Sequence, residues 1–382
     1  MSDQSATPPT PPVPPEGEGA PFDVGSEWLR NDGVCNDVVL SSRVRLARNL
    51  ARRPFSPKAT RRDRQEILDL CRAAIMDQSS RGRLIWVDLH TSPPLDRALL
   101  VERHLISKQH SKGKGTNPND DPRGVAISVP GERLSIMVNE EDHLRIQTMR
   151  SGLALAEAWE EINGKDDEIE AQLDFAFSPK FGYLSTCPTN LGTGLRMSAM
   201  LHLPGLRLTG EIEKVKRAAT DMGLAVRGFY GEGSEAVGDL FQVSNQTTLG
   251  KSEEQVLHEL EKEILPKIVE YERLSRRELL SKRRIGLEDQ VWRAWGLLTS
   301  ARLLTTEEAM QGLSLVRLGA VLGVLPPVRT TSPSGPSPKL ANQLMLLVQP
   351  AHLQRSVGRE LDQEQRRVAR ASLVRSRLTR AN

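Results

Sequence analysis

Apolar residues in the first 250 positions follow two spacings, which predict a mixture of strands and helices. Short apolar runs bounded by turn residues predict strands at 84–89, 124–129, 134–138, 224–230 and 240–244. Helical spacing predicts helices at 61–78, 144–162 and 206–222. A charged turn, KDDE, is expected after the second helix. The elements do not alternate regularly, so the pattern favours an α+β fold, an antiparallel sheet flanked by helices, over a doubly wound sheet.

From residue 251 onward the pattern is helical throughout. Ser252 with Gln255, and Thr305 with Glu308, have the spacing of capping boxes that begin helices. Pro266 should kink or interrupt the first of these helices, and a basic helix is expected at 357–379. The first 24 residues are rich in proline and poor in apolar side chains, which is typical of disorder. We therefore expect three regions: a disordered tail (1–24), an α+β domain (25–250) and an all-helical domain (251–382).

Composition narrows the class of protein. The net charge of +3 gives no strong bias toward nucleic acid. No run of 18 apolar residues predicts a membrane span, and the N-terminus lacks the pattern of a signal peptide. Cys35, Cys71 and Cys187 are widely spaced and form no CxxC pair, which argues against disulfides and a structural zinc site. We expect a cytoplasmic protein without a nucleic-acid or membrane partner.

Two stretches place charged side chains directly beside apolar runs. In SSRVR (41–45), a strand would point Arg43 and Arg45 to the same face. Two guanidinium groups side by side repel each other unless an anion lies between them, although a solvated edge strand would have the same spacing. In NEEDHLRIQ (139–147), Glu140 and Glu141 come four or five residues before Arg145, a pattern that an ordinary acidic helix start also shows.

A third stretch, STCPTNLGTGLRMSAM (185–200), contains two closely spaced glycines. Gly192 and Gly194 predict a tight turn into a helix, where backbone N–H groups and Arg196 would hold a phosphate. No lysine follows the glycines, so this is not a Walker A loop, and the turn alone is a weak signal. Cys187 could also be a small buried residue, which is the commoner role of a free cysteine.

A fourth stretch, VRGFYGEGSEAVG (226–238), is a glycine-rich loop with three charged residues, and a mobile acidic turn would have the same composition. Together, SSRVRLARN, NEEDHLRIQ, CPTNLGTGLR and RGFYGEGSEA resemble the ATP:guanido phosphotransferases, such as arginine kinase and creatine kinase, in order and approximate spacing. VVLSSRVRLARN, ERHLIS, SNQTTLG and MLHLPGL are most similar to the bacterial protein-arginine kinases of that family. The resemblance is strong over about residues 36–250 and weak beyond them.

The resemblance implies that the chain uses ATP, with Mg²⁺ carried by the nucleotide phosphates and no protein metal site. Five arginines match the family's phosphate-binding arginines: Arg43, Arg45, Arg145, Arg196 and Arg227. His104 matches a histidine on the adenine side, although a lone histidine is often structural. The nucleotide-binding set that the resemblance implies is Ser41, Ser42, Arg43, Val44, Arg45, His104, Arg145, Arg196, Met197, Ser198, Ala199, Met200, Arg227, Gly228, Phe229, Tyr230, Gly231 and Glu232.

On the acceptor side, a protonated guanidinium has no lone pair with which to attack. Carboxylates must hold it in plane and remove a proton as the N–P bond forms. Glu141 matches the family's key glutamate and is the expected general base. Glu235 matches the second glutamate, with Glu232 in support. Cys187 matches the active-site cysteine, which orients the guanidinium without forming a covalent adduct.

Two departures from the small-molecule kinases favour an arginine displayed on a protein as acceptor. Those kinases carry a helical domain where this sequence has a proline-rich tail, and an arginine where it has Tyr230. Two alternatives stay open: a phosphagen-type kinase acting on free arginine or another small guanidine, and a non-catalytic adaptor that binds phosphoarginine. The resemblance also implies a role in stress response, with a Clp-type protease and a heat-shock repressor as partners. The helical region suggests a homodimer.

Near their C-terminus, the protein-arginine kinases carry an Arg-Asp-x-x-Arg-Ala motif in a regulatory phosphoarginine pocket. The nearest match here is RRVARA (366–371), in which Arg366, Arg370 and Ala371 fit the motif and Arg367 replaces its acidic residue. On a helix, Arg366 and Arg370 share a face and could clamp a phosphate; a solvated basic helix end would have the same pattern. Without the acid, we expect poor selectivity for phosphoarginine and weak allosteric activation.

Overall fold

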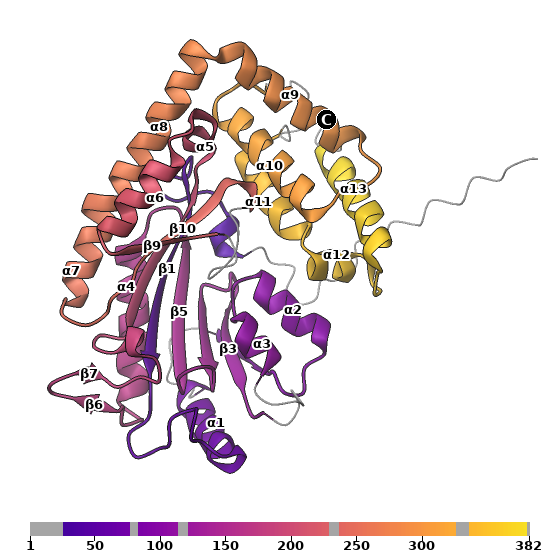
Figure 1. The fold of residues 1–382 in the computed structure, drawn as a ribbon. Coiled ribbons are helices and arrows are strands. Elements are labelled where there is room, and N and C mark those ends of the chain that lie inside the picture. The colour runs from indigo at the N-terminus through magenta and orange to yellow at the C-terminus, as the bar shows by residue number, and fades with distance from the viewer. Residues whose placement is uncertain (1–25, 77–82, 114–120, 229–236, 326–335, 380–382) are drawn as a thin grey trace, which may run out of the picture.

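An eight-stranded sheet forms the centre of the molecule (Figure 1). The computed structural model describes residues 26–76, 83–113, 121–228, 237–325 and 336–379. The strand order is β2-β3-β4-β5-β1-β8-β10-β9, and every neighbouring pair is antiparallel. This architecture confirms the α+β prediction and rules out a doubly wound sheet.

The sheet strands are β1 (Val39–Arg48), β2 (Arg83–Asp88), β3 (Gly124–Val129), β4 (Leu134–Val138), β5 (Leu144–Ser151), β8 (Leu195–His202), β9 (Leu224–Arg227) and β10 (Leu240–Asn245). A separate small hairpin pairs β6 (Phe177–Ser178) with β7 (Gly182–Tyr183). The helices of the first 250 residues are α1 (Arg61–Met76), α2 (Pro94–Glu102), α3 (Lys108–Lys112), α4 (Leu155–Glu170), α5 (Pro204–Thr209) and α6 (Ile212–Asp221). The later helices are α7 (Glu253–His258), α8 (Leu265–Lys282), α9 (Arg284–Ser300), α10 (Thr306–Val321), α11 (Pro338–Leu347), α12 (Pro350–Val357) and α13 (Gln363–Thr379).

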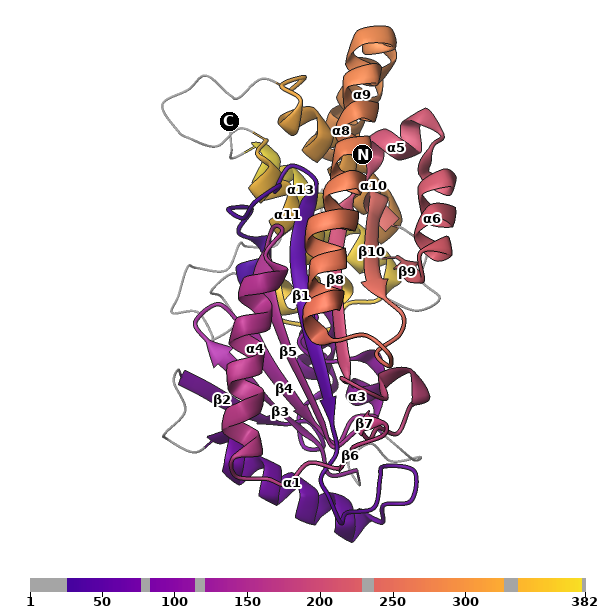
Figure 2. The same cartoon turned by 90° about the vertical axis from the view of Figure 1, so that its left-hand side faces the viewer.

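One face of the sheet is covered by α1, α4, α7 and α8, and Figure 2 looks onto α4 and α8 in front of the strands. Alternate residues of the central strands point into this layer, including Val44 and Leu46 of β1 and Met197 of β8, all fully buried. Side chains along a strand alternate between its two faces. The residues between these core positions therefore project from the opposite face.

The opposite face of the sheet packs against other helices at two places. The C-terminal helices α9, α10, α11 and α13 share a buried cluster with Leu40, Met149 and Met200 of the sheet. At the other edge, α2 and the residues after it pack on β3 and β4. The sheet surface between these two clusters remains open, and it is where the charged motif residues lie.

The helical region confirms several sequence-based predictions. Both capping boxes are formed, at Ser252–Gln255 and at Thr305–Glu308. Pro266 lies in the first turn of α8, directly after a π-helical segment at Glu259–Ile264, so the α-helical hydrogen-bond pattern is broken there while the chain stays helical. Helices α7 and α8 share the apolar cluster of the sheet, and the division into domains at residue 250 stays a prediction. Within the described ranges, no helix is long and apolar enough to cross a membrane.

Two of the predicted helices are wrong at functionally important places. Residues 144–151 form strand β5, and the helix begins only at Leu155 and includes the KDDE segment. The stretch after Gly194 is strand β8 and not a helix. Both strands lie inside the sheet with neighbours on each side. Because residues on both their faces are largely covered, the alternation of apolar and polar residues that marks a half-exposed strand is weak in their sequences.

Smaller differences concern burial and boundaries. The run at 84–89, read as a buried strand, is the edge strand β2 and is only half-buried. The helix expected at 206–222 is two helices, because Gly210 ends α5 with a left-handed backbone (φ 82°). The basic C-terminal helix begins at Gln363, after Gly358 ends α12 in the same way.

Candidate functional site

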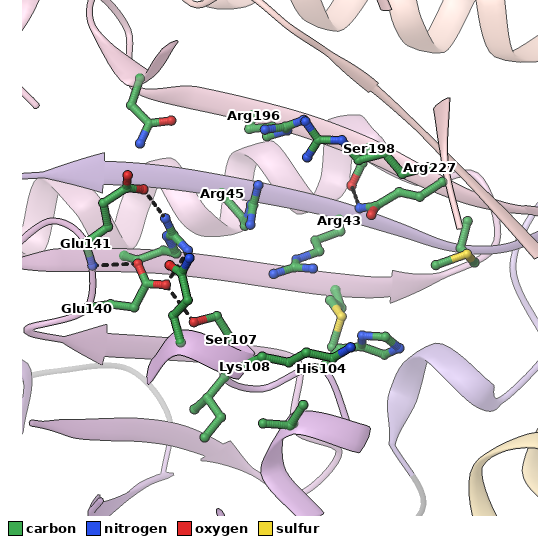
Figure 3. Close-up of a pocket in the computed structure, with 18 of the residues that line it drawn as sticks. Arg43, Arg45, His104, Ser107, Lys108, Glu140, Glu141, Arg196, Ser198 and Arg227 are labelled. Carbon is green, nitrogen blue, oxygen red and sulfur yellow. Dashed lines mark hydrogen bonds and ion pairs between the residues drawn. The ribbon is translucent and has the colours of Figure 1, made fainter. Parts of the chain in front are cut away.

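A cavity of about 420 Å³ lies on the open face of the sheet, between the two flanking clusters. Its floor is made by β1, β5, β8 and β10, and its walls by the segment after α2 and by the turn between β4 and β5. Figure 3 shows arginines from the strands around one space, with Glu140 and Glu141 at one end and His104 at the other. Charged residues from separate motifs of the sequence therefore lie around one cavity.

Strand register brings the arginines together. Arg43 and Arg45 point to the same face of β1, and Arg45 lies directly opposite Arg196 of β8. Arg227 of β9 lies opposite Gln242 of β10, which also lines the cavity. Each guanidinium is thus placed by a paired strand and not by a free loop. Rigid placement means that little ordering is needed when a ligand binds.

Crowding of positive charge dominates the electrostatics of this group. Burial, followed by the charges of Arg145 and Arg196, lowers the pKa of Arg43 to about 9. The pKa of Arg45 lies well below its ordinary value for the same reasons: burial has the largest effect, and the charge of Arg43 the next largest. The Nε of Arg43 has no hydrogen-bond partner, and the side chain of Arg45 makes no hydrogen bond to the described residues. A polyanion such as a nucleotide triphosphate would supply both the missing charge and the missing acceptors.

The end of the cavity beside His104 is largely apolar. Trp28, Met149 and Met200 line it, and the ring of Trp28 meets that of His104 edge to face with centroids 5.3 Å apart. Burial lowers the pKa of His104 to about 3, so the imidazole is neutral at physiological pH. A flat, neutral, partly apolar slot next to a cationic surface fits the base of a nucleotide whose phosphates lie among the arginines.

The opposite end of the cavity holds two carboxylates on the turn between β4 and β5. Arg145 lies between them: its guanidinium is 2.9 Å from Glu140 Oε1 and 3.1 Å from Glu141 Oε2. Glu140 also accepts hydrogen bonds from Ser107 Oγ (2.6 Å) and from the backbone N–H of Glu141 (2.6 Å). The turn begins at Asn139, whose left-handed backbone (φ 64°) is held by side-chain bonds to two carbonyls.

The two carboxylates differ in their electrostatics. Burial alone would raise the pKa of Glu140, but Arg145, Ser107 and His110 together hold it below its ordinary value. Glu141 is half-buried, and burial raises its pKa even though Arg145 acts against the shift. Cys187 also lines the cavity, where its thiol acts against the rise in the pKa of Glu141 and lies 3.0 Å from Thr189 Oγ1. Glu140 is thus a fixed anion, whereas Glu141 can exchange a proton.

Not every residue of the implied nucleotide-binding set lines the cavity. The residues whose side chains line it are Ser41, Arg43, Arg45, His104, Arg145, Arg196, Ser198, Met200 and Arg227, with Glu141 and Cys187 of the acceptor set. Four alternate strand residues point to the other face: Ser42, Val44, Met197 and Ala199. Gly228 directly follows β9 and is buried. Phe229, Tyr230, Gly231, Glu232 and Glu235 lie outside the described residues.

Several residues that line the cavity or contact its lining were not assigned a role from the sequence. Gln147 accepts a hydrogen bond from Arg43 (2.5 Å) and donates one to the His104 carbonyl (2.6 Å). Trp28, Ser107 and Lys108 line the cavity. Gln147 is within the charged stretch already singled out, and Ser107 ends ERHLIS. Gln147 could have been identified as a site residue only by knowing which face of β5 it lies on. The sequence pattern instead predicted a helix for this segment.

The candidate phosphoarginine motif lies on α13, in the C-terminal helical layer. Arg370 is buried and donates to the carbonyls of Val348 (2.8 Å) and Leu304 (2.9 Å), while Arg366 donates to the carbonyl of Leu361. Ala371 is fully buried. The pocket remains a prediction. Among the residues that the structure describes, no group of three or more His, Cys, Asp or Glu side chains could hold a metal ion.

Comparison with known proteins gives consistent results along the chain. Residues 66–275 match the catalytic domain of ATP:guanido phosphotransferases, and residues 284–382 match the C-terminal domain of the protein-arginine kinase McsB. The sequence is 46% identical to a protein-arginine kinase of Symbiobacterium thermophilum, covering 93% of this chain and 97% of the relative. It is 43% identical to a protein-arginine kinase of Halothermothrix orenii, covering 92% of this chain and 96% of that relative.

Solved structures agree on the fold. A lombricine kinase superposes with a TM-score of 0.54 and 27% sequence identity, covering 62% of this chain and 66% of that one. A duplicated taurocyamine kinase from Schistosoma mansoni superposes with a TM-score of 0.56 and 24% identity, covering 75% and 41%, which bears on the fold alone.

Proposed function

The chain belongs to the ATP:guanido phosphotransferase family, and from this premise we propose that it transfers the γ-phosphoryl group of ATP to arginine side chains of proteins. One observation carries the proposal: a cationic, donor-rich surface and a pair of carboxylates face each other across a single cavity. Phosphoryl transfer to a guanidinium needs both, because the donor is a polyanion and the acceptor is a cation. The matches to protein-arginine kinases over almost the whole chain favour a protein as the acceptor.

On the donor side, Arg43, Arg45 and Arg196 hold the phosphates, and the base lies in the slot beside His104 and Trp28. Mg²⁺ bound to the nucleotide would neutralise part of the charge on its phosphates, and the arginines would hold the remainder. The arginines are arranged before the nucleotide arrives, because paired strands fix their backbones. Their charge therefore stabilises the transferring phosphoryl group with little reorganisation.

On the acceptor side, the arginine side chain enters beside Glu141 and Cys187. A terminal guanidinium nitrogen forms a bond to the γ-phosphorus while the bond from that phosphorus to the bridging oxygen breaks and ADP leaves. Glu141 accepts the proton that the nitrogen loses, and its raised pKa suits a group that gains a proton in the reaction. Glu140 keeps its negative charge and fixes Arg145 at the boundary between the two halves of the site.

The proposal is tested by offering two acceptors to the purified chain with labelled ATP: an unfolded arginine-rich protein and free L-arginine. We expect label on the protein and little or none on the free amino acid. Label on free L-arginine alone would support the alternative of a small-guanidine kinase. A chain that binds ATP and phosphoarginine but labels neither acceptor would support the adaptor alternative.

The wider role is also a proposal. We propose that the protein works in the cytoplasm during stress, as a homodimer, and that it marks proteins for a Clp-type protease and modifies a heat-shock repressor. The C-terminal match to the domain of protein-arginine kinases supports this assignment. Light scattering on the full chain tests the dimer. Recovery of a Clp-type subunit or a repressor as an arginine-phosphorylated or bound protein tests the partners.

A further inference from the structure

A buried polar cluster joins the C-terminal helical layer to the segment that forms one wall of the cavity. Helix α12 lies against α2, and Glu102, the last residue of α2, caps the start of α12. Its carboxylate accepts from the backbone N–H groups of Ala351 (2.7 Å) and His352 (2.9 Å). No side chain of α12 itself provides such a cap. The contact therefore satisfies donors that α12 would otherwise leave unpaired.

The ring of His352 lies between Glu102 and Arg103, and both of its nitrogens are used. Nδ1 lies 2.7 Å from Glu102 Oε2, and Nε2 lies 3.2 Å from Arg103 Nε. An ionised carboxylate only accepts and an arginine N–H only donates, so the imidazole is neutral, with its proton on Nδ1. Arg103 is held further by an ion pair with Glu132, which accepts from Ser26 Oγ (2.7 Å). The side chains of this cluster are all buried.

The next residue along the chain, His104, belongs to the cavity. Its backbone is in the left-handed region (φ 60°), an uncommon conformation for a residue with a side chain. The conformation is held from both sides. The cluster around Arg103 fixes the preceding residue, and Gln147 donates to the His104 carbonyl (2.6 Å). The same Gln147 accepts from Arg43. A continuous chain of hydrogen bonds and adjoining backbone thus leads from α12 to an arginine on the cavity floor.

We propose that His352 is a positioning residue for the nucleotide site, acting through Arg103 on the backbone of His104 and, through Gln147, on Arg43. The inference rests on the proposed function, since it assigns nucleotide binding to that cavity. The hydrogen bond that Arg103 donates to His352 Nε2 transmits this positioning effect, because it fixes the residue directly before the left-handed residue His104. The bond to Glu102 instead serves the docking of α12 on α2. His352 would then influence ATP binding without touching ATP.

Two substitutions separate these roles. In His352→Asn, the side-chain amide is placed to replace Nδ1 and keep the bond to Glu102, but it cannot reach Arg103. In His352→Gln, the terminal oxygen is placed to replace Nε2 and accept from Arg103. A matched control is Arg355→Ala, which removes an exposed ion pair between the same two helices, with 3.7 Å between Arg355 and Asp96. Exposed pairs of this kind contribute little to stability.

The measurement is a titration of the full chain with ATP in the presence of Mg²⁺, together with the KM values for ATP and for a protein acceptor. For His352→Asn we expect Kd and KM for ATP to rise about tenfold, the loss typical of one buried hydrogen bond to a charged group. The acceptor KM should change less than about twofold, because the carboxylate end is remote from the cluster. His352→Gln and Arg355→Ala should bind ATP within about threefold of the unsubstituted chain.

ATP binding by His352→Asn at the original affinity would overturn the inference. Equal loss in His352→Asn and His352→Gln, matched by equal falls in Tm, would also overturn it, because the residue would then only hold α12 in place. Failure of the proposed function would look different: the unsubstituted chain itself would bind no ATP or would label no arginine.

Discussion

Two arginines in different regions of the molecule have the same depressed pKa but opposite relations to their surroundings. Burial lowers the pKa of Arg43, in the cavity, and of Arg317, at the junction between the sheet and α10, to about 9 in each case. The guanidinium of Arg317 donates hydrogen bonds to the Asn342 side chain, to the carbonyls of Asp37 and Asn36, and to His202. Arg43 has one such bond, to Gln147, and its Nε has none.

The comparison shows that a perturbed pKa does not by itself distinguish a binding arginine from a structural one. Desolvation lowers the pKa in either place. The number of donors left unused is the informative quantity, because a structural arginine satisfies its donors with protein acceptors and a binding arginine keeps them for a ligand. The same contrast separates Glu141, which is half-buried at the cavity, from Glu272, whose carboxylate accepts from two backbone N–H groups and from Arg276.

The largest expected effect is on transfer when Glu141 is replaced. We expect Glu141→Gln to lower kcat by about 10³-fold, in the range lost when a general base is removed. ATP affinity should stay within about threefold, because Glu141 lies at the acceptor end. The matched control, Glu272→Gln, should lower Tm and leave the transfer rate of the folded fraction nearly unchanged. Transfer by Glu141→Gln at the original rate would show that another group is the base.

Arginine substitutions test whether unused donors distinguish a binding arginine from a structural one. Arg45→Ala should weaken transfer by about 10²-fold, since one fixed charge at the phosphates is lost. Its Tm should not fall, because removing a crowded cation relieves repulsion. Arg317→Ala should instead destabilise the fold by about 3 kcal/mol or more, because several buried acceptors lose their donor. Thermal unfolding and transfer assays on both variants measure these two losses. A large loss of stability in Arg45→Ala would show that Arg45 is also a structural arginine, like Arg317.

A finer test compares two arginines within the cavity. Arg196 lies on β8, inside the sheet, and donates to Ser244 (3.1 Å), whereas Arg227 lies on the edge strand β9. We expect Arg196→Ala to cost about tenfold more in kcat than Arg227→Ala, because the more rigid charge contributes more to transition-state stabilisation. Equal losses in single-turnover measurements would contradict the ranking.

The pH dependence of transfer should show the base directly. A base must be ionised, so kcat/KM falls as the pH drops through the pKa of Glu141, which burial places above its ordinary value. His104 does not contribute to this limb, because its pKa is about 3. Glu140→Gln removes a neighbouring negative charge and should move the acid limb to lower pH. A shift in the opposite direction would show that another group titrates there.

The smallest expected effect concerns the C-terminal motif. Free phosphoarginine should raise the transfer rate by less than about twofold, because Arg367 stands where a carboxylate would pair with the ligand's guanidinium. Inorganic phosphate is the control ligand, and Arg370→Ala is the control variant. Strong activation that is specific to phosphoarginine and vanishes in Arg370→Ala would show that the missing acid does not matter.

The sequence predicts much of the fold because several elements carry local signals. The strands β3 and β4 and the capping boxes at Ser252 and Thr305 lie where their turn and cap residues place them. Strands β5 and β8 were missed because most residues on both of their faces are buried, so their sequences show little alternation of apolar and polar residues. The partners of β8, strands β1 and β10, are also far away in sequence, so no local turn marks that strand. Strand β5 does pair locally with β4, but the acidic turn between them also fits a helix start.

The site was predicted in part. Arg43 and Arg45 were correctly placed on one face, because a two-residue spacing in a strand fixes that relation. The roles of Gln147 and Trp28 depend on contacts with His104, which is more than 40 positions away from each of them, and local sequence contains no information about such contacts. The same holds for His352, which meets Arg103 from a helix about 250 positions later in the chain.

Arginine kinase activity is tested most directly by mass spectrometry of a protein acceptor after incubation with ATP and the full chain, under conditions that preserve acid-labile phosphate. We expect phosphate on arginine side chains that is lost on acid treatment and is absent when Glu141→Gln replaces the unsubstituted chain. Acid-stable phosphate on serine, threonine or tyrosine, or arginine phosphate that persists at full yield with Glu141→Gln, would contradict it.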